Sequence, residues 1–179
     1  MSERKLILFL DSGDTIVDES TEIRDENKVV RFARPWPGAA EALRRLKALG
    51  FRMCMVADGL IESFEVVYRV MELYDCFEQR VYSEAVGQHK PHPAMFECAL
   101  EKMGLSRADC GRILMVGNNL ARDVAGANAM GIHSVFIDQS PRYPKATDDP
   151  QAQPEFTIHS MDELPELALR LDAQLQSAN

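Results

Sequence analysis

Hydrophobic and polar positions along the chain alternate between two patterns. Short, continuous apolar runs such as "KLILFL" (residues 5–10) and "RILMVG" (112–117) are typical of strands buried on both faces of a sheet. Between such runs lie longer segments in which apolar residues recur every three or four positions, as on one face of a helix. The regular alternation predicts right-handed βαβ units and a parallel sheet with helices on both faces.

The two patterns and the glycine and proline positions place the individual elements. Strands are expected at residues 5–10, 51–57, 80–83, 112–117, 133–138 and 156–158. Helices are expected at residues 37–50, 60–75, 93–104, 121–131 and 161–176. Pro93 falls in the first turn of one helix and Gly104 follows its last turn, in agreement with the usual start and stop signals.

Two segments do not fit the alternation. Residues 18–35 read as a small hairpin, because "TEIR" and "VVRFA" alternate and "DENK" suits a turn. Residues 138–154 contain four prolines and no periodicity, which is typical of a surface loop. With 179 residues, we expect a single core domain over 1–179 that carries these two segments.

Composition narrows the class of protein. Apolar residues make up 46% and charged residues 27%, as in ordinary globular proteins. The net charge of −8 argues against nucleic acid as a partner, although one lysine can still dominate a pocket for a small phosphorylated ligand. No apolar run approaches the length of a membrane span, and the apolar run near the N-terminus is too short for a signal peptide. We therefore expect a cytoplasmic enzyme or binding protein with no membrane partner.

Four short stretches follow the expected strands and carry chemically useful residues. They are Asp11, "ADG" (57–59), "HKP" (89–91) and "GNNLARD" (117–123). Each is weak alone, since an Asp after a strand is more often a turn former or a helix cap. Ligands of open parallel sheets bind beyond the carboxyl ends of the strands. Together and in this order, the stretches predict one site at one edge of the sheet.

The motifs around these residues also have a family pattern. "DSGDT" contains Asp11 and Thr15, "GQHKPHPAMF" contains Lys90, and "VGNNLARDVAGA" contains Gly117 and Asp123. In these motifs the chain resembles the haloacid dehalogenase-like superfamily of aspartate-nucleophile phosphohydrolases, over nearly its whole length. The resemblance implies a three-layer, Rossmann-like α/β fold. The hairpin at 18–35 would take the place of the cap domain that many members carry, so the site is expected to be open.

The resemblance implies a role for each matching residue. Asp11 would be the nucleophile, since a carboxylate can form an acyl phosphate. Lys90 would stabilise the phosphate and the phosphoaspartate. The turn formed by Ala57, Asp58 and Gly59 would bind phosphate oxygens through backbone N–H groups.

The same resemblance implies a magnesium site. Asp11, the Gly13 carbonyl and Asn118 would approach Mg²⁺, with Asp123 in support, because Mg²⁺ prefers oxygen ligands. Asn118 stands where the family has an aspartate, and a neutral amide attracts the cation more weakly. Ala57 stands where the family has a Ser or Thr hydroxyl. These changes predict weaker metal and phosphate binding.

The largest departure lies two positions after the nucleophile. Family phosphatases have an aspartate there as general acid and base, whereas this chain has Gly13, which cannot carry a proton. Losing a general acid typically costs about 10²–10⁴-fold in rate. Asp14 is one candidate replacement, or it stabilises the turn. Asp58 is a second candidate, or it caps the helix expected at 60–75.

Two functions are compatible with these residues. The first is an Mg²⁺-dependent phosphohydrolase with an aspartyl-phosphate intermediate, acting on a phosphorylated small molecule or protein. The alternative is a weakened or inactive descendant that serves as a phosphate-binding, regulatory or scaffold protein. Gly13, Ala57 and Asn118 favour the alternative, whereas Asp11 and Lys90 favour the enzyme. An open site implies a large substrate, or enclosure by a second copy of the chain in a homo-oligomer.

Overall fold

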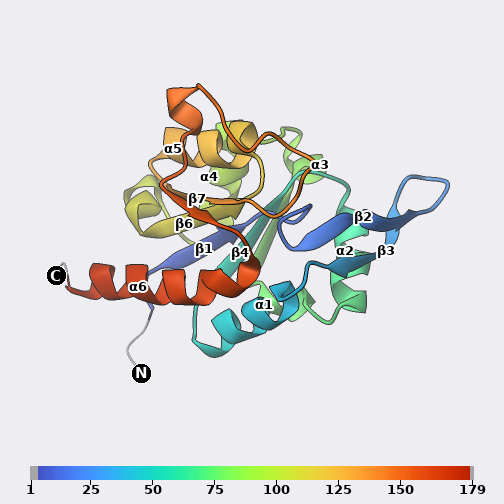
Figure 1. The fold of residues 1–179 in the computed structure, drawn as a ribbon, viewed down its shortest axis with the longest axis horizontal. Coiled ribbons are helices and arrows are strands. Elements are labelled where there is room, and N and C mark those ends of the chain that lie inside the picture. The colour runs from blue at the N-terminus through green and yellow to red at the C-terminus, as the bar shows by residue number, and fades with distance from the viewer. Residues whose placement is uncertain (1–3, 178–179) are drawn as a thin grey trace.

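The computed structural model describes residues 4–177 as one parallel sheet between two layers of helices (Figure 1). The sheet has six strands in the order β5-β4-β1-β6-β7-β8, and every neighbouring pair is parallel. These strands are β1 (Ile7–Leu10), β4 (Arg52–Ala57), β5 (Gln79–Tyr82), β6 (Ile113–Gly117), β7 (His133–Ile137) and β8 (Phe156–Ile158). The predicted parallel sheet is confirmed.

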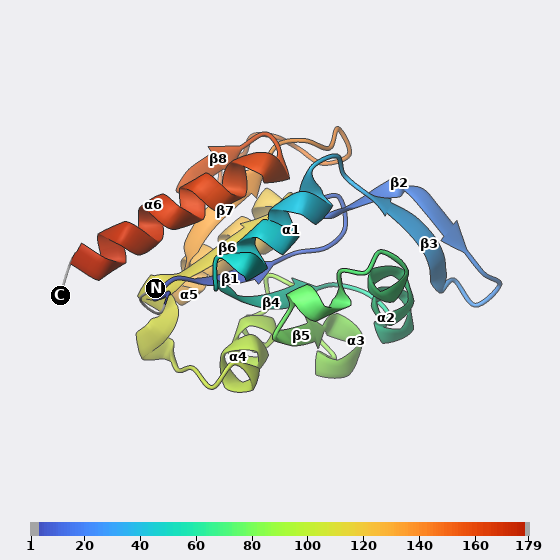
Figure 2. The same ribbon diagram turned by 90° about the horizontal axis from the view of Figure 1, so that it is seen from below.

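The helices cover both faces of the sheet, as Figure 2 shows. One side carries α1 (Ala39–Ala48) and α6 (Leu164–Ser177). The opposite side carries α4 (Pro93–Lys102) and α5 (Ala125–Met130). The remaining α-helices, which lie at the carboxyl end of the sheet, are α2 (Ile61–Val70) and α3 (Ser83–Val86). The shorter helical turns are Tyr74–Cys76, Arg107–Arg112, Leu120–Val124, Pro150–Ala152 and Met161–Glu163.

The central strand explains the continuous apolar run in the sequence. Leu8 and Leu10 pack into the core beneath α1 and α6, whereas Ile7 and Phe9 pack into the core beneath α4 and α5. All four side chains are fully buried. Because alternate residues of a strand point to opposite faces, a strand between two helical layers must be apolar at every position. The strand therefore ends where the first polar residue, Asp11, appears.

The predicted hairpin is present. Its strands are β2 (Val17–Arg24) and β3 (Val30–Pro35), and they pair in the antiparallel direction. The hairpin projects from the carboxyl end of β1, and β3 packs against α2 (Figure 1). Val30 N–H donates a hydrogen bond of 3.0 Å to Ser63 Oγ of that helix. The hairpin thus forms one wall beside the ends of the central strands.

Some details differ from the sequence expectation. The helix expected at 60–75 ends at Val70, because the chain turns there, with Glu72 in the left-handed region (φ 55°), to enter β5. The helix expected at 121–131 opens with a wider π-helical turn at Leu120–Val124. The short α3 was not expected. Within residues 4–177, no helix is both long and apolar enough to cross a bilayer.

Candidate active site

Asp11 lies at the carboxyl end of the central strand β1. Its backbone N–H donates to the Val116 carbonyl at 2.9 Å, which continues the pairing with β6 by one residue. The chain then turns sharply, because the Ser12 carbonyl accepts the N–H groups of three following residues, Thr15, Ile16 and Val17. Thr15 Oγ1 returns to donate a 3.1 Å hydrogen bond to Asp11 Oδ2. The first motif therefore holds one carboxylate oxygen and leaves the other free for a second partner.

That second partner is Lys90, whose side chain is 2% exposed. Its Nζ lies 2.7 Å from Asp11 Oδ1, 2.7 Å from Asp123 Oδ1 and 2.8 Å from the Val56 carbonyl. Burial by itself would lower the pKa of Lys90, but nearby carboxylates, Asp11 foremost, raise it above its ordinary value. Lys90 is therefore an ammonium ion between two carboxylates, and it brings together motifs that are far apart in the sequence.

Asp123 is the third member of this group and is fully buried. Its Oδ2 accepts the N–H of Asn119 at 3.0 Å. A Cβ at position 117 would lie 2.2 Å from Asp123 Oδ2, so the glycine at the end of β6 is what lets this carboxylate approach. Burial and the charge of Asp11 raise the pKa of Asp123, while Lys90 opposes the shift.

The four residues expected to hold magnesium line one small cavity of about 70 Å³. They are Asp11, Gly13, Asn118 and Asp123. Four acid residues of the lining, Asp11, Glu19, Asp58 and Asp123, face only two basic ones, Lys90 and Arg122. A volume of this size has room for about five water-sized groups. The cavity suits a phosphoryl group together with a cation.

The Asn118 side chain in this lining would fit a hard cation if its amide group were turned over. Among the described side chains, Asn118 Nδ2 is buried without a hydrogen-bond partner, and Asp123 Oδ1 has only the ion pair with Lys90. A half-turn of the amide would place the Asn118 oxygen where the nitrogen lies. Residues 4–177 hold no cluster of three or more His, Cys, Asp or Glu side chains able to bind a metal. Mg²⁺ uses few carboxylates and completes its shell with carbonyls and water.

The turn after β4 differs from its expected role. Gly59 N–H already donates to Ser83 Oγ at 2.9 Å, and the Ala57 side chain belongs to the apolar core. Asp58 Oδ1 accepts the backbone N–H of Lys90 at 3.1 Å, and its Oδ2 lies 3.4 Å from Arg122 Nη1. The expected phosphate donor at Gly59 is therefore occupied. Asp58 lines the cavity but serves to hold the Lys90 loop.

Asp14 does not line this cavity. Its backbone is left-handed (φ 52°), and its buried side chain points to the loop at 138–154. Oδ2 accepts a 3.0 Å hydrogen bond from Ser140 Oγ and lies 2.8 Å from Arg142 Nε. Of the two interpretations of Asp14, the geometry favours the one in which it stabilises the turn. The same contacts show that the expected surface loop is anchored at its start.

Besides Tyr143, two further residues at the cavity were not anticipated from the sequence. Arg122, from the π-helical turn, donates to the Tyr143 hydroxyl at 3.2 Å and faces the cavity beside Asp58. Burial would lower the pKa of Arg122, but Tyr143 and nearby carboxylates raise it, so the guanidinium stays charged. Its place inside "GNNLARD" was the available signal, because it follows the same strand end as Asn118.

The second unanticipated residue is Glu19, from β2 of the hairpin. A Cβ added at Gly13 would lie 1.9 Å from Glu19 Oε1, so this carboxylate occupies the space of a side chain at position 13. Burial, followed by the charge of Asp14, raises the pKa of Glu19. Only the folding of the hairpin back over the turn brings the two positions together, and the sequence held no comparable signal.

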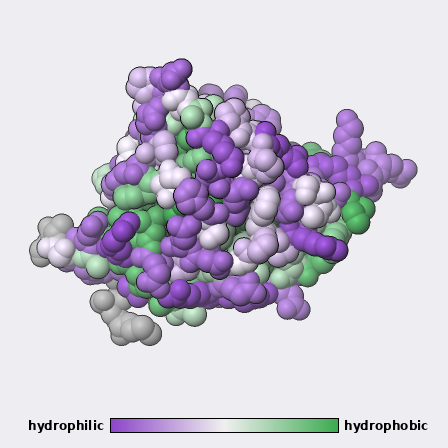
Figure 3. Space-filling model, in the orientation of Figure 1, coloured by the Kyte–Doolittle hydropathy of each residue, from purple (hydrophilic) through white to green (hydrophobic). Residues whose placement is uncertain are grey.

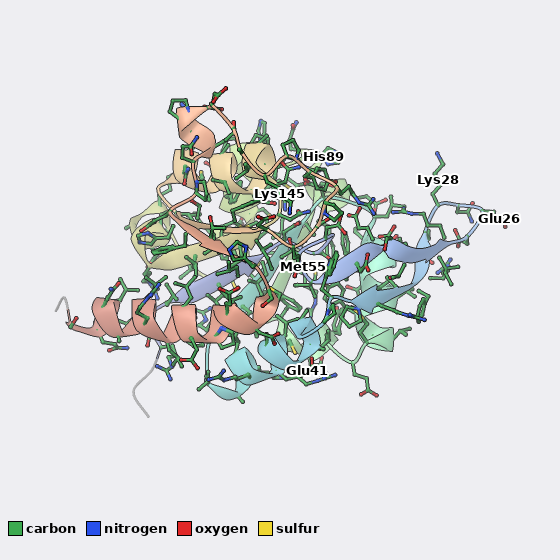
Figure 4. All side chains as sticks on the ribbon, viewed as in Figure 1. Glu26, Lys28, Glu41, Met55, His89 and Lys145 are labelled. Atoms are coloured by element: carbon green, nitrogen blue, oxygen red, sulfur yellow. The ribbon has the colours of Figure 1, made fainter. Side chains whose placement is uncertain are left out.

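A second, more apolar cavity of about 140 Å³ adjoins the first, between the hairpin and α2. Its apolar lining is Val17, Val30, Leu60, Phe64, Val67 and Tyr68. Gly13, Glu19 and Asp58 line both cavities. His89, labelled in Figure 4, is largely exposed and lies 3.7 Å from Asp58 Oδ1. The site thus has a charged end at the strand tips and an apolar end under the hairpin.

Comparison with known proteins gives relatives with related chemistry. A family model described as haloacid dehalogenase-like hydrolase matches residues 3–131. Glyceraldehyde 3-phosphate phosphatase of Methanocaldococcus jannaschii is 30% identical over 81% of this chain and 61% of its own length. The Pyrococcus abyssi protein of the same name is 35% identical over 62% of this chain and 45% of its own length. Haloacetate dehalogenase H-2 of a Moraxella species is 32% identical over 81% of this chain and 61% of its own length.

The chain therefore spans about half to three fifths of the length of these curated relatives. Among solved structures, a HAD phosphatase from Thermococcus onnurineus superposes with a TM-score of 0.73 at 16% identity, covering 90% of this chain and 97% of the other. An uncharacterized protein from Listeria monocytogenes gives 0.75 at 21% identity, with 94% and 99% coverage. At sequence identities of 16% and 21%, the structural similarity shows a shared fold and no more.

Proposed function

Since the chain belongs to the haloacid dehalogenase-like hydrolase family, we propose that it is an Mg²⁺-dependent phosphohydrolase with Asp11 as its nucleophile. One observation carries the proposal. Lys90 Nζ lies 2.7 Å from Asp11 Oδ1 inside a small, charged cavity at the carboxyl ends of the central strands. The relatives named as phosphatases support a small phosphorylated substrate.

In this proposal Asp11 performs covalent catalysis. Its carboxylate attacks phosphorus, the bond to the leaving-group oxygen breaks, and an acyl phosphate forms on Asp11. Lys90 pairs with the Asp11 carboxylate at 2.7 Å and would stabilise the charge on the phosphoryl oxygens. Arg122, at the same cavity, offers a second cation to those oxygens. Water then attacks phosphorus and releases inorganic phosphate.

The residues suited to magnesium are Asp11, the Gly13 carbonyl, Asn118 and Asp123. Bound there, Mg²⁺ would neutralise part of the charge on the phosphoryl group. The excess of carboxylates in the cavity and the unpartnered Asn118 amide support this assignment. Lys90 alone cannot balance two carboxylates and an incoming phosphate dianion.

The charge of the cavity also favours phosphoryl transfer over removal of a halogen, which the relative from Moraxella performs by its name. A released halide would face the three remaining acid residues, Glu19, Asp58 and Asp123, while Asp11 is esterified. A phosphoryl dianion that enters together with Mg²⁺ adds no net charge to this cavity, whereas a halide ion adds a negative charge. The cavity under the hairpin would receive the rest of the substrate, and the hairpin takes the place of a cap domain.

The test is hydrolysis of an aryl phosphate and of acetyl phosphate, with and without Mg²⁺. We compare the unmodified protein, Asp11→Asn, and the matched control Asp75→Asn at an exposed position on the short turn after α2. Hydrolysis that needs Mg²⁺, that Asp11→Asn abolishes and that Asp75→Asn preserves is the expected result. Full activity in Asp11→Asn would contradict the proposal. No hydrolysis of either compound by the unmodified protein would also contradict it and would favour a phosphate-binding role.

A further inference from the structure

The proposed reaction lacks one component, the group that moves the proton. Position 13 is glycine, Asp14 is directed to Ser140 and Arg142, and Asp58 holds the backbone N–H of Lys90. If the proposed function holds, another residue of this site must protonate the leaving group.

The side chain of Glu19 fills the space that glycine leaves open. The three heavy atoms nearest to a Cβ at position 13 all belong to Glu19: Oε1 at 1.9 Å, Cδ at 2.9 Å and Cγ at 3.3 Å. The backbone at Gly13 is not in the left-handed region, so it has no need of glycine for its conformation. The atoms that a side chain at position 13 would meet first are those of Glu19. A carboxyl group is therefore present beside the nucleophile, although it comes from another strand.

The location of Glu19 suits a leaving group. It lines both the charged cavity that contains Asp11 and Lys90 and the apolar cavity under the hairpin. The oxygen that links a phosphoryl group to the rest of a substrate must lie at the junction of these two spaces. Proton transfer requires that the carboxyl group reach this oxygen, and the junction is where Glu19 is found.

One oxygen of Glu19 is held and the other is free to act. Arg142 Nη1 lies 3.2 Å from Oε2, and the same guanidinium contacts Asp14 Oδ2 through Nε at 2.8 Å. Oε1 is the atom directed at Gly13. The loop at 138–154 thereby orients the Glu19 carboxyl group from behind.

We propose that Glu19 is the proton-transfer residue of this site, taking the place of a carboxyl side chain at position 13. As Asp11 attacks phosphorus and the bond to the leaving-group oxygen breaks, that oxygen takes a proton from the Glu19 carboxyl group. The resulting Glu19 carboxylate accepts a proton from the water whose oxygen then attacks phosphorus. The bond between phosphorus and the Asp11 oxygen breaks, phosphate leaves, and both side chains return to their starting states.

The first test compares leaving groups in Glu19→Gln. We measure kcat/KM, which reports the steps up to departure of the leaving group, on an alkyl phosphate and on a nitrophenyl phosphate. An alkoxide needs a proton, so kcat/KM on the alkyl phosphate should fall by about 10²–10⁴-fold. A nitrophenolate leaves without one, so the fall on the aryl phosphate should stay below about tenfold. The matched control is Glu26→Gln, at the exposed tip of the hairpin (Figure 4).

The second test moves the carboxyl group to position 13. Glu19→Ala opens the space, and Gly13→Asp in that background places a carboxyl group there from the turn after β1. On the alkyl phosphate, kcat/KM of the double variant should exceed that of Glu19→Ala by at least about tenfold. That gain is a part of what a general acid contributes. A recovery of activity in the double variant can be interpreted even if Glu19→Gln is unstable, because a folding defect cannot restore turnover.

Specific results would overturn the inference. It fails if Glu19→Gln lowers kcat/KM equally on both substrates, or if the double variant recovers none of the lost activity. It also fails if the unmodified protein hydrolyses the alkyl phosphate no faster than Glu19→Gln does. In all these cases Asp11→Asn is still inactive on the aryl phosphate, so the proposed function survives. Activity in Asp11→Asn would instead remove the proposed function itself.

Discussion

Lys90 is the residue on which the charge balance of the site depends. Its ammonium group is buried and lies between the carboxylates of Asp11 and Asp123. Removing one partner of a buried ion pair leaves an uncompensated charge, which typically costs about 3–5 kcal/mol. The lysine therefore supports the fold as well as the reaction.

We predict that Lys90→Met loses hydrolytic activity and about 3–5 kcal/mol of unfolding free energy, measured in urea at pH 7. In the double variant Lys90→Met/Asp123→Asn, one of the two carboxylates left without a cation is removed. Part of the lost stability should return, but the activity should not. Lys102→Met, in which an exposed lysine is replaced, should change neither. A stability equal to that of the unmodified protein in Lys90→Met would contradict the buried ion-pair arrangement.

The sequence could predict some of these residues but not others. The positions of Asp11, Lys90 and Asp123 follow from strand ends and motif spacing, and the structure brings the three side chains together. The direction of the Asp14 side chain depends on a left-handed backbone that no pattern of residues indicates. Glu19 reaches position 13 only because the hairpin folds back, which is a property of the three-dimensional structure.

At the scale of elements, the loop at 138–154 is attached to the active-site turn by Asp14. Ser140 Oγ and Arg142 Nε both contact Asp14 Oδ2. We predict that Asp14→Ala frees the loop, so that trypsin cleaves after Arg142 or Lys145 several times faster. Asp148→Ala, at an exposed position farther along the same loop, is the matched control. Unchanged cleavage in Asp14→Ala would show that these contacts do not hold the loop.

A second attachment joins α6 to the start of the sheet. Asp172 is buried and accepts the backbone N–H groups of Lys5 and Leu6 at 2.8 and 3.0 Å, and it forms an ion pair with Arg4 at 3.0 Å. Asp172→Ala leaves these donors without a partner and should cost about 2–3 kcal/mol in urea unfolding at pH 7.

The pH dependence of this contact has a definite sign. Burial opposes ionisation of Asp172, but hydrogen bonds from Leu6 and Lys5 and the Arg4 charge outweigh it and lower its pKa below 3.8. A lowered pKa contributes stability above the unfolded value and loses it as the pH falls through the folded value. The stability difference between the unmodified protein and Asp172→Asn should therefore be full at pH 6 and shrink below about pH 4. A difference that grows on acidification would contradict the assignment.

Most elements could be predicted because each has a local signal. Continuous apolar runs give the strands, since a parallel strand between two helical layers is buried on both faces. The end of α2 at Val70 could not be predicted, because apolar residues continue past it at helical spacing. The apolar residues after Val70 lie in a turn instead, because the chain must reverse there to reach β5.

At the scale of the whole molecule, the charge of the protein and of its site have the same sign. The chain carries a net charge of −8, and hydrophilic residues cover most of the face seen in Figure 3, including the outer end of the hairpin. The cavity at the strand ends adds a local excess of carboxylates. A divalent cation at that cavity would therefore stabilise the folded protein by binding the native state alone.

We predict that Mg²⁺ at 100 times its Kd raises the thermal midpoint by about 5–10 °C, and that EDTA reverses the rise. In Asp123→Asn, which removes a carboxylate from the cavity, the rise should be smaller. The control Asp75→Asn should show the full rise. An equal rise in both variants would show that the cation binds elsewhere.

The overall architecture could be predicted because the alternation of strand and helix patterns extends along the chain. The strand order, which places β1 and β6 side by side at the centre, gives Asp11 and Asn118 neighbouring positions. The apolar cavity under the hairpin could not be predicted, since it depends on how β3 packs against α2.

Phosphorylation of Asp11 during turnover can be measured by trapping the aspartyl phosphate. The protein is quenched in acid while it hydrolyses acetyl phosphate, then reduced with borohydride, which converts an acyl phosphate on aspartate to homoserine. Peptide mass spectrometry then locates the homoserine. We expect homoserine at position 11 and none in Asp11→Asn. Homoserine at Asp14 or Asp58 instead, or none at all during active turnover, would contradict it.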